Sequence, residues 1–139
     1  MIILDTSGLL SAIDSSQRLH PAARGVLEGS EGPFILSPFV LAELDYLLAT
    51  KVGSREQLSL LAEVGRGAYR LEPFAAADVE RARVILERYA DLGLGLADAS
   101  NVVLSHRYGI LDILTLDERH FRAVSGAEDW PFRLLPVDL

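Results

Sequence analysis

The chain contains no cysteine, a single lysine and no long uninterrupted apolar run. Without cysteine there is no disulfide framework, no thiolate catalysis and no thiolate zinc site. No apolar run approaches the ~20 residues that a membrane-spanning helix needs. The first residues, Met-Ile-Ile-Leu-Asp, also lack the basic segment of a signal peptide. We therefore expect a protein that does not associate with membranes and that works in the cytoplasm.

Positive charge is scarce as well, since 13 Lys and Arg stand against 20 Asp and Glu, giving a net charge of -7. This balance argues against a protein that grips nucleic acid by bulk electrostatic attraction. It does not exclude a nucleic-acid substrate, because divalent metals bound at an acidic site would reverse the local field. Every cation except Lys51 is arginine, a bias that suits phosphate contacts but that a GC-rich genome explains more simply.

The chain has the size and composition of one folded domain. It has 139 residues, of which 50% are hydrophobic, enough for a sizeable core. We find no internal repeat, low-complexity segment or linker, so we predict a single domain over residues 1–139. Apolar runs alternate with helical patterns along the whole chain, which is typical of an α/β domain with a mostly parallel sheet.

Short apolar runs mark the predicted strands, and longer amphipathic stretches mark the helices between them. We predict strands at 2–4, 34–37, 69–72, 113–115 and 132–135. Helices are predicted at 7–14, 20–28, 38–52, 54–65, 75–89 and 96–108, with a glycine-containing loop at 91–95.

Two acids follow buried strands at equivalent positions. Asp5 directly ends the first strand, and Asp117 follows the strand at 113–115 by two residues. Taken alone, each could be a helix cap or a turn residue. Ligand sites in open α/β sheets lie beyond the carboxyl ends of the strands, and adjacent parallel strands bring those ends together. We therefore expect Asp5 and Asp117 to lie side by side.

Two further acids are predicted on helices. Glu43 lies one turn from Phe39 and Leu47, so we expect it on an apolar stripe, where a carboxylate must be paired, protonated or metal-bound. A buried salt bridge to an arginine is the alternative. Asp98 lies in the first turn of the helix at 96–108. Its alternative role is to stabilise the helix dipole, by roughly 0.3–1 kcal/mol.

Asp5, Glu43, Asp98 and Asp117 would repel one another if they met at one edge of the sheet. Two such charges ~4 Å apart repel by roughly 4 kcal/mol at an effective dielectric of about 20. A cluster of this kind needs cations, and oxygen ligands without cysteine favour Mg²⁺ or Mn²⁺ over zinc. The corresponding chemistry is metal-assisted hydrolysis of a phosphodiester.

Four segments around these acids resemble the acidic motifs of PIN-domain ribonucleases, and they are most similar to the VapC toxins of bacterial toxin–antitoxin pairs. The segments are Leu4-Asp5-Thr6-Ser7, Leu41-Ala42-Glu43-Leu44, Leu96-Ala97-Asp98-Ala99 and Thr115-Leu116-Asp117-Glu118-Arg119-His120-Phe121. The resemblance extends from Ile2 to Pro136. It implies a three-layer α/β/α fold with a five-stranded parallel sheet.

The same resemblance implies a Mg²⁺- or Mn²⁺-dependent endoribonuclease toxin that cuts a structured RNA, such as a transfer RNA or a ribosomal RNA hairpin, and so inhibits translation. It implies inhibition by a VapB-like antitoxin and a homodimeric state. All four acidic positions are filled, and the resemblance assigns Asp5, Glu43, Asp98 and Asp117 as metal ligands, directly or through water.

Neighbouring residues are expected to support this chemistry. We expect the hydroxyl groups of Thr6, Ser7 and Thr115 to orient carboxylates. Arg119 and Arg122 are expected to contact substrate phosphates, with salt bridges and helix capping as the alternative. His120 is interpreted as a structural histidine, with contact to substrate phosphates as the alternative. Trp130 is expected to pack near the last strand, with base stacking as the alternative.

Two other functions compete with a nuclease. A phosphoryl-accepting enzyme with Asp5 as nucleophile would need a second Asp where Ser7 stands, or a lysine after a late strand, whereas Lys51 ends a helix. A PIN-like module that binds RNA or protein without cleaving it stays open. Metal-dependent cleavage that is lost in Asp5→Asn would separate the nuclease from this module.

Overall fold

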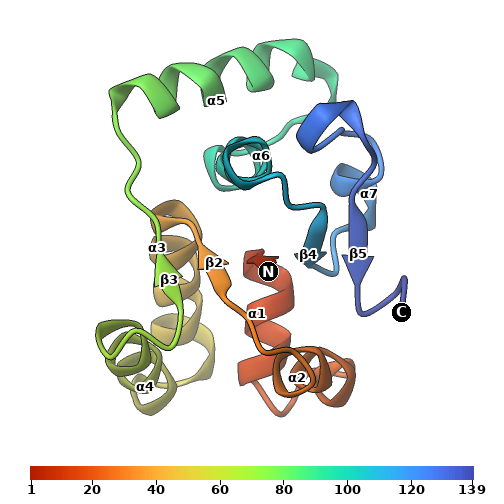
Figure 1. The fold of residues 1–139 in the computed structure, drawn as a ribbon. Helices are drawn as coiled ribbons and strands as arrows, with labels where there is room; N and C mark the ends of the chain where they lie inside the picture. The colour runs from red at the N-terminus through yellow and green to blue at the C-terminus, as the bar shows by residue number, and fades with distance from the viewer.

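The five predicted strands form one parallel sheet in the computed structural model, which describes residues 1–139 (Figure 1). The strand order is β3-β2-β1-β4-β5, and every neighbouring pair is parallel. The strands are β1 (Ile2–Leu4), β2 (Phe34–Leu36), β3 (Arg70–Leu71), β4 (Asp112–Leu114) and β5 (Arg133–Leu135). In the register, Leu4 pairs with Leu36 on one side and with Leu114 on the other. The carboxyl ends of β1, β2 and β4 are therefore level.

Seven α-helices cover the sheet: α1 (Thr6–Ile13), α2 (His20–Glu28), α3 (Pro38–Leu47), α4 (Ser54–Gly65), α5 (Ala76–Arg88), α6 (Leu96–Tyr108) and α7 (Glu118–Phe121). A π-helical turn, Leu48–Val52, continues α3 to the end that the sequence predicts. Short 3₁₀ turns lie at Ala90–Leu92 and Ala127–Asp129. None of the helices has the length and apolar character that crossing a bilayer requires.

The side chains of the strands alternate between two apolar layers, as the period-2 geometry of a strand requires. Leu4, Leu36 and Leu114 pack against α1, α2, α3 and α4, whereas Ile3 and Ile113 pack against α6 and α7. All five of these side chains are buried, and each contributes roughly 1.5–3 kcal/mol to stability. In Figure 1, α5 and α6 lie above the sheet, and α1, α2 and α4 lie below it. The predicted three-layer α/β/α fold is confirmed.

A close approach of α1 to β4 places the end of β1 next to the end of β4. A Cβ at Gly8 would lie only 2.3 Å from the Leu114 carbonyl oxygen, so only glycine fits at this position. The Asp5 backbone N–H donates to the same oxygen over 3.0 Å. As a result, the first residue after β1 lies against the first residue after β4, Thr115.

Candidate active site

Three acids meet beyond the carboxyl ends of β1 and β4. Asp5 follows β1 and is only 3% exposed. Asp98 lies in the first turn of α6, where its Oδ2 accepts a hydrogen bond from the Gly95 backbone N–H over 3.0 Å. Asp117 precedes α7 and caps it, because its Oδ1 accepts from the His120 backbone N–H over 3.0 Å. The structure thus brings together Asp5, Asp98 and Asp117, each from a different segment.

The Asp5 carboxylate is held by three side-chain donors. Its Oδ2 accepts from the Thr115 hydroxyl over 2.7 Å and from the Ser7 hydroxyl over 3.2 Å. Its Oδ1 accepts from Asn101 Nδ2 over 3.3 Å. Ser7 and Thr115 therefore make the contacts that an orienting role requires. Thr6 does not, because its Oγ1 is buried without a hydrogen-bond partner, and the expectation for its side chain is wrong.

The buried surroundings of Asp5 raise the pKa of its carboxyl group. Burial raises the pKa of Asp5 to about 7, although the hydrogen bond from Thr115 acts in the opposite direction, and the nearby charge of Asp98 raises the pKa further. Near neutral pH the buried Asp5 carboxyl is therefore partly protonated and partly ionised. A cation placed beside it would favour the anion.

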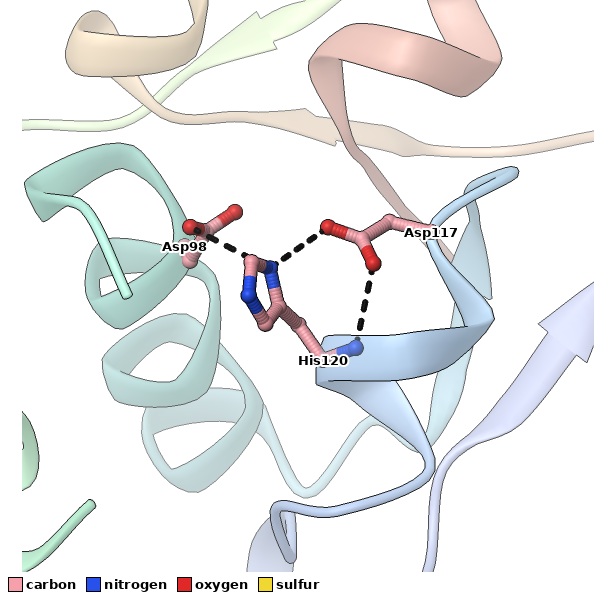
Figure 2. A group of neighbouring side chains, drawn as sticks. All are labelled: Asp98, Asp117 and His120. Atoms are coloured by element: carbon pink, nitrogen blue, oxygen red, sulfur yellow. Dashed lines mark hydrogen bonds and ion pairs between the residues drawn. The ribbon is translucent and has the colours of Figure 1, made fainter. Parts of the chain in front are cut away.

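His120 lies between two of the acids, as Figure 2 shows. Its Nδ1 is 2.7 Å from Asp117 Oδ2 and 4.0 Å from Asp98 Oδ2, while its Nε2 is 3.0 Å from the Leu92 carbonyl oxygen. Carboxylate and carbonyl oxygens only accept, so both hydrogen bonds form together when both ring nitrogens carry a proton. These hydrogen bonds fit the structural role favoured for His120, and they also place its ring between two acids of the site, which was not predicted. The signal in the sequence was its spacing of three residues from Asp117.

Glu43 does not lie on a buried apolar stripe, so that part of the prediction is wrong. The buried residues of α3 include Val40 and Leu44, and Glu43 is about 100° around the helix from Leu44. Glu43 is exposed and makes no hydrogen bond or ion pair, which also excludes the alternative of a buried salt bridge. Tyr46, three residues after Glu43, is 66% exposed as well. The α3 helix contacts both α1 and α6, and the role of Glu43 as a metal ligand stays a prediction.

The two arginines near Asp117 differ in their surroundings. Arg119 is exposed and makes no ion pair, so its guanidinium is available to a ligand. Arg122 is held by Asp138 at 2.6 Å and by Glu118 at 3.3 Å, the alternative role foreseen for it. Trp130 is 60% exposed, so its expected packing against the last strand is wrong.

The residues present fit a divalent metal ion. Ligand atoms of Asp98, Asp117 and His120 all lie within 4.8 Å of one another. Asp5 is linked to them through Thr115, whose hydroxyl donates to Asp5 and accepts from the Asp117 backbone N–H over 3.0 Å. A donor set made mainly of carboxylate oxygens suits a hard cation such as Mg²⁺ or Mn²⁺. A cation would also offset the burial and the nearby charge of Asp98, which together raise the pKa of Asp5.

Comparisons with known proteins agree on one family. Residues 2–127 match the family profile described as PIN domain. The chain is 42% identical over 135 residues to Ribonuclease VapC26 of Mycobacterium tuberculosis, covering 97% of this chain and 100% of that protein. It is also similar to the crystal structure of M. tuberculosis VapC20, a sarcin–ricin loop cleaving toxin, with a TM-score of 0.76 and 25% identity. That alignment covers 84% of this chain and 90% of the other.

Proposed function

The chain belongs to the PIN-domain family and, within it, to the VapC ribonucleases, and from this membership we propose that it is a Mg²⁺- or Mn²⁺-dependent endoribonuclease acting as a toxin on structured RNA. The observation that carries the metal dependence is the buried carboxyl of Asp5, surrounded by donors and flanked by Asp98. Such a group is expensive to ionise unless a cation is bound beside it.

Each residue of the site has a distinct task in this proposal. Asp5, Asp98 and Asp117 hold the ion, with Glu43 completing the set from α3. Ser7 and Thr115 keep the Asp5 carboxylate in one orientation through their hydroxyl groups. When bound, the ion supplies Lewis-acid stabilisation of the charge that develops on the phosphodiester.

Backbone hydrogen bonds fix the side chains of Asp98 and His120. The hydrogen bond from the Gly95 N–H fixes the Asp98 side chain at the start of α6. His120 joins α7 to the Leu92 carbonyl and places its ring beside Asp117. This side chain therefore fixes the orientation of the Asp117 carboxylate.

Structured RNA is the substrate class that we propose. VapC20, which shares the fold, is a sarcin–ricin loop cleaving toxin, and a ribosomal or transfer RNA hairpin would suit this chain as well. With a net charge of -7, the chain cannot rely on bulk attraction for RNA. Arg119 is exposed two residues after Asp117 and is the proposed phosphate contact next to the site.

A VapB-like antitoxin, a homodimeric state and a cytoplasmic location complete the proposal. Coexpression with a VapB-like antitoxin, followed by light scattering on the purified sample, tests the first two. A complex of fixed composition that no longer cuts RNA supports the antitoxin. A lone chain of monomer mass at micromolar concentration contradicts the dimer.

An RNA digestion assay tests the proposed activity. Purified protein is incubated with total RNA in Mg²⁺, in Mn²⁺ and in EDTA, and the new ends are mapped by sequencing. Asp98→Asn is the test variant, and Asp91→Asn is the matched control, because Asp91 is exposed and makes no hydrogen bond or ion pair.

We expect discrete cuts in the wild type and in Asp91→Asn that are absent in EDTA and in Asp98→Asn. Cuts that persist in EDTA would contradict the metal dependence. Tight RNA binding without any cut would favour a binding module instead.

A further inference from the structure

One buried amide in the acidic site has a role that the acids alone do not explain. Asn101 lies on α6, one turn after Asp98, and is 0% exposed. Its Nδ2 donates to Asp5 Oδ1 over 3.3 Å, whereas its Oδ1 has no hydrogen-bond partner. Buried polar atoms are nearly always paired in folded proteins. The unpaired oxygen therefore indicates that this amide is kept for a reason other than stability.

The orientation of the amide follows from its partner. An ionised carboxylate only accepts, so the Asn101 nitrogen, and not its oxygen, faces the Asp5 anion. An ionised carboxylate offers about four acceptor positions. Thr115 and Ser7 take positions on Oδ2, and Asn101 takes one on Oδ1. The Thr6 backbone N–H adds a further hydrogen bond to the Asp5 carboxylate. Asn101 is the side-chain donor that contacts Oδ1, so its loss would leave this oxygen without a side-chain partner.

The residue type suits this position. A leucine of similar size would offer no donor to Asp5, and an aspartate would add a further negative charge beside Asp5 and Asp98. Asparagine donates a hydrogen bond while adding no charge. It also reaches Asp5 from the same helix that carries Asp98, so one rigid element fixes both acids.

We propose that Asn101 is a positioning residue of the metal site, which holds the Asp5 carboxylate in the orientation that binding of the divalent ion requires. This inference rests on the proposed metal-dependent function. Asn101 acts through Asp5 and takes no part in the reaction itself. Loss of an outer hydrogen bond of this kind typically weakens metal binding by about 10–100-fold.

Metal affinity, measured apart from activity, tests the proposal. Mn²⁺ is titrated calorimetrically into the wild type, Asn101→Leu and Asn101→Ser, and thermal unfolding of each is recorded in EDTA. The matched control is Ser105→Ala, because Ser105 is a buried polar residue of the same helix whose hydroxyl contacts Ile110 and Ala127 and none of the acids.

We expect both Asn101 variants to bind Mn²⁺ about 10–100-fold more weakly. Asn101→Leu should also melt in EDTA at or above the wild-type temperature, since the unpaired oxygen is gone. Excess Mn²⁺ should restore their RNA cleavage towards the wild-type rate. Ser105→Ala should melt earlier but bind Mn²⁺ as the wild type does.

Unchanged Mn²⁺ affinity in both Asn101 variants would overturn the proposal while leaving the proposed function intact. Equal weakening in Ser105→Ala would overturn it too, because the effect would then be general destabilisation. A wild type that neither binds Mn²⁺ nor cuts RNA would overturn the proposed function together with this inference.

Discussion

Replacing Asp5 with asparagine should change how stability depends on pH. Burial raises the pKa of Asp5 from 3.8 to about 7. Because the folded state binds the Asp5 proton more tightly than the unfolded chain does, the protonated carboxyl adds to stability at low pH. This contribution is fully present below the unfolded pKa and is lost as the pH rises through the folded pKa. A shift of about three units corresponds to roughly 4 kcal/mol at 1.36 kcal/mol per unit. This is a large share of the ~5–15 kcal/mol that stabilises a typical domain.

Urea unfolding in EDTA, between about pH 4 and pH 8, measures this effect. In the wild type, the free energy of unfolding should fall by up to about 4 kcal/mol across this window relative to Asp5→Asn. Asp91→Asn, which changes an exposed acid without partners, should follow the wild type. Parallel curves for the wild type and Asp5→Asn would refute the reasoning, because Asp5 would then titrate as an exposed carboxyl does.

Three further substitutions test other parts of the structure. Glu43→Gln should leave the free energy of unfolding in urea within about 0.5 kcal/mol of the wild type, because Glu43 is exposed and unpaired. It should nevertheless abolish RNA cleavage, and normal cleavage would remove Glu43 from the site. Ser100→Ala removes the buried 2.6 Å hydrogen bond to Ser37 that joins α6 to the start of α3. The free energy of unfolding in urea should fall by about 1–3 kcal/mol. An unchanged urea midpoint would contradict this prediction. Gly8→Ala places a Cβ 2.3 Å from the Leu114 carbonyl oxygen. It should lower the free energy of unfolding by at least about 1–3 kcal/mol, measured as a lower melting temperature. An unchanged melting temperature would mean that α1 can move away from β4.

The link between Asp5 and Asp117 through Thr115 could be predicted because it depends on strand patterns alone. The apolar runs at 2–4 and 113–115 mark buried parallel strands. The carboxyl ends of neighbouring parallel strands lie level, which brings the residues that follow them close together. The sequence contains the strand that ends at Asp5, and the register Leu4 to Leu114 then brings Thr115 beside it. The contact between Thr115 and Asp5 thus follows from local features that sequence reasoning handles well.

The exposure of Glu43 could not be predicted, because α3 has apolar residues on nearly every side. Phe39 and Leu47 suggest one buried face, and Val40 and Leu44 suggest another. Both patterns have helical spacing, so periodicity does not select between them. Packing against α1 and α6 selects the face that carries Val40 and Leu44.

The place of His120 in the site was missed for a different reason. One of its two hydrogen-bond partners, Asp117, is three residues away, but the other is the carbonyl of Leu92 in a distant turn. Contacts of this kind depend on how remote segments pack, and the pattern around His120 does not encode them. Asn101 could be noticed from its spacing to Asp98, but its contact with Asp5 required the assembled sheet.

Calorimetry tests most directly whether the acids form one cation site. Mn²⁺ is titrated into the wild type and Asp5→Asn at about pH 6. Two buffers with different ionisation enthalpies are used, so that the number of protons released on binding can be measured. With a pKa of about 7, Asp5 is mostly protonated at that pH and must release its proton when the ion binds. We predict saturable binding to the wild type with close to one proton released per ion, and much weaker binding without proton release in Asp5→Asn. The absence of binding to the wild type, or identical binding and proton release in Asp5→Asn, would contradict a metal-dependent nuclease built on this site.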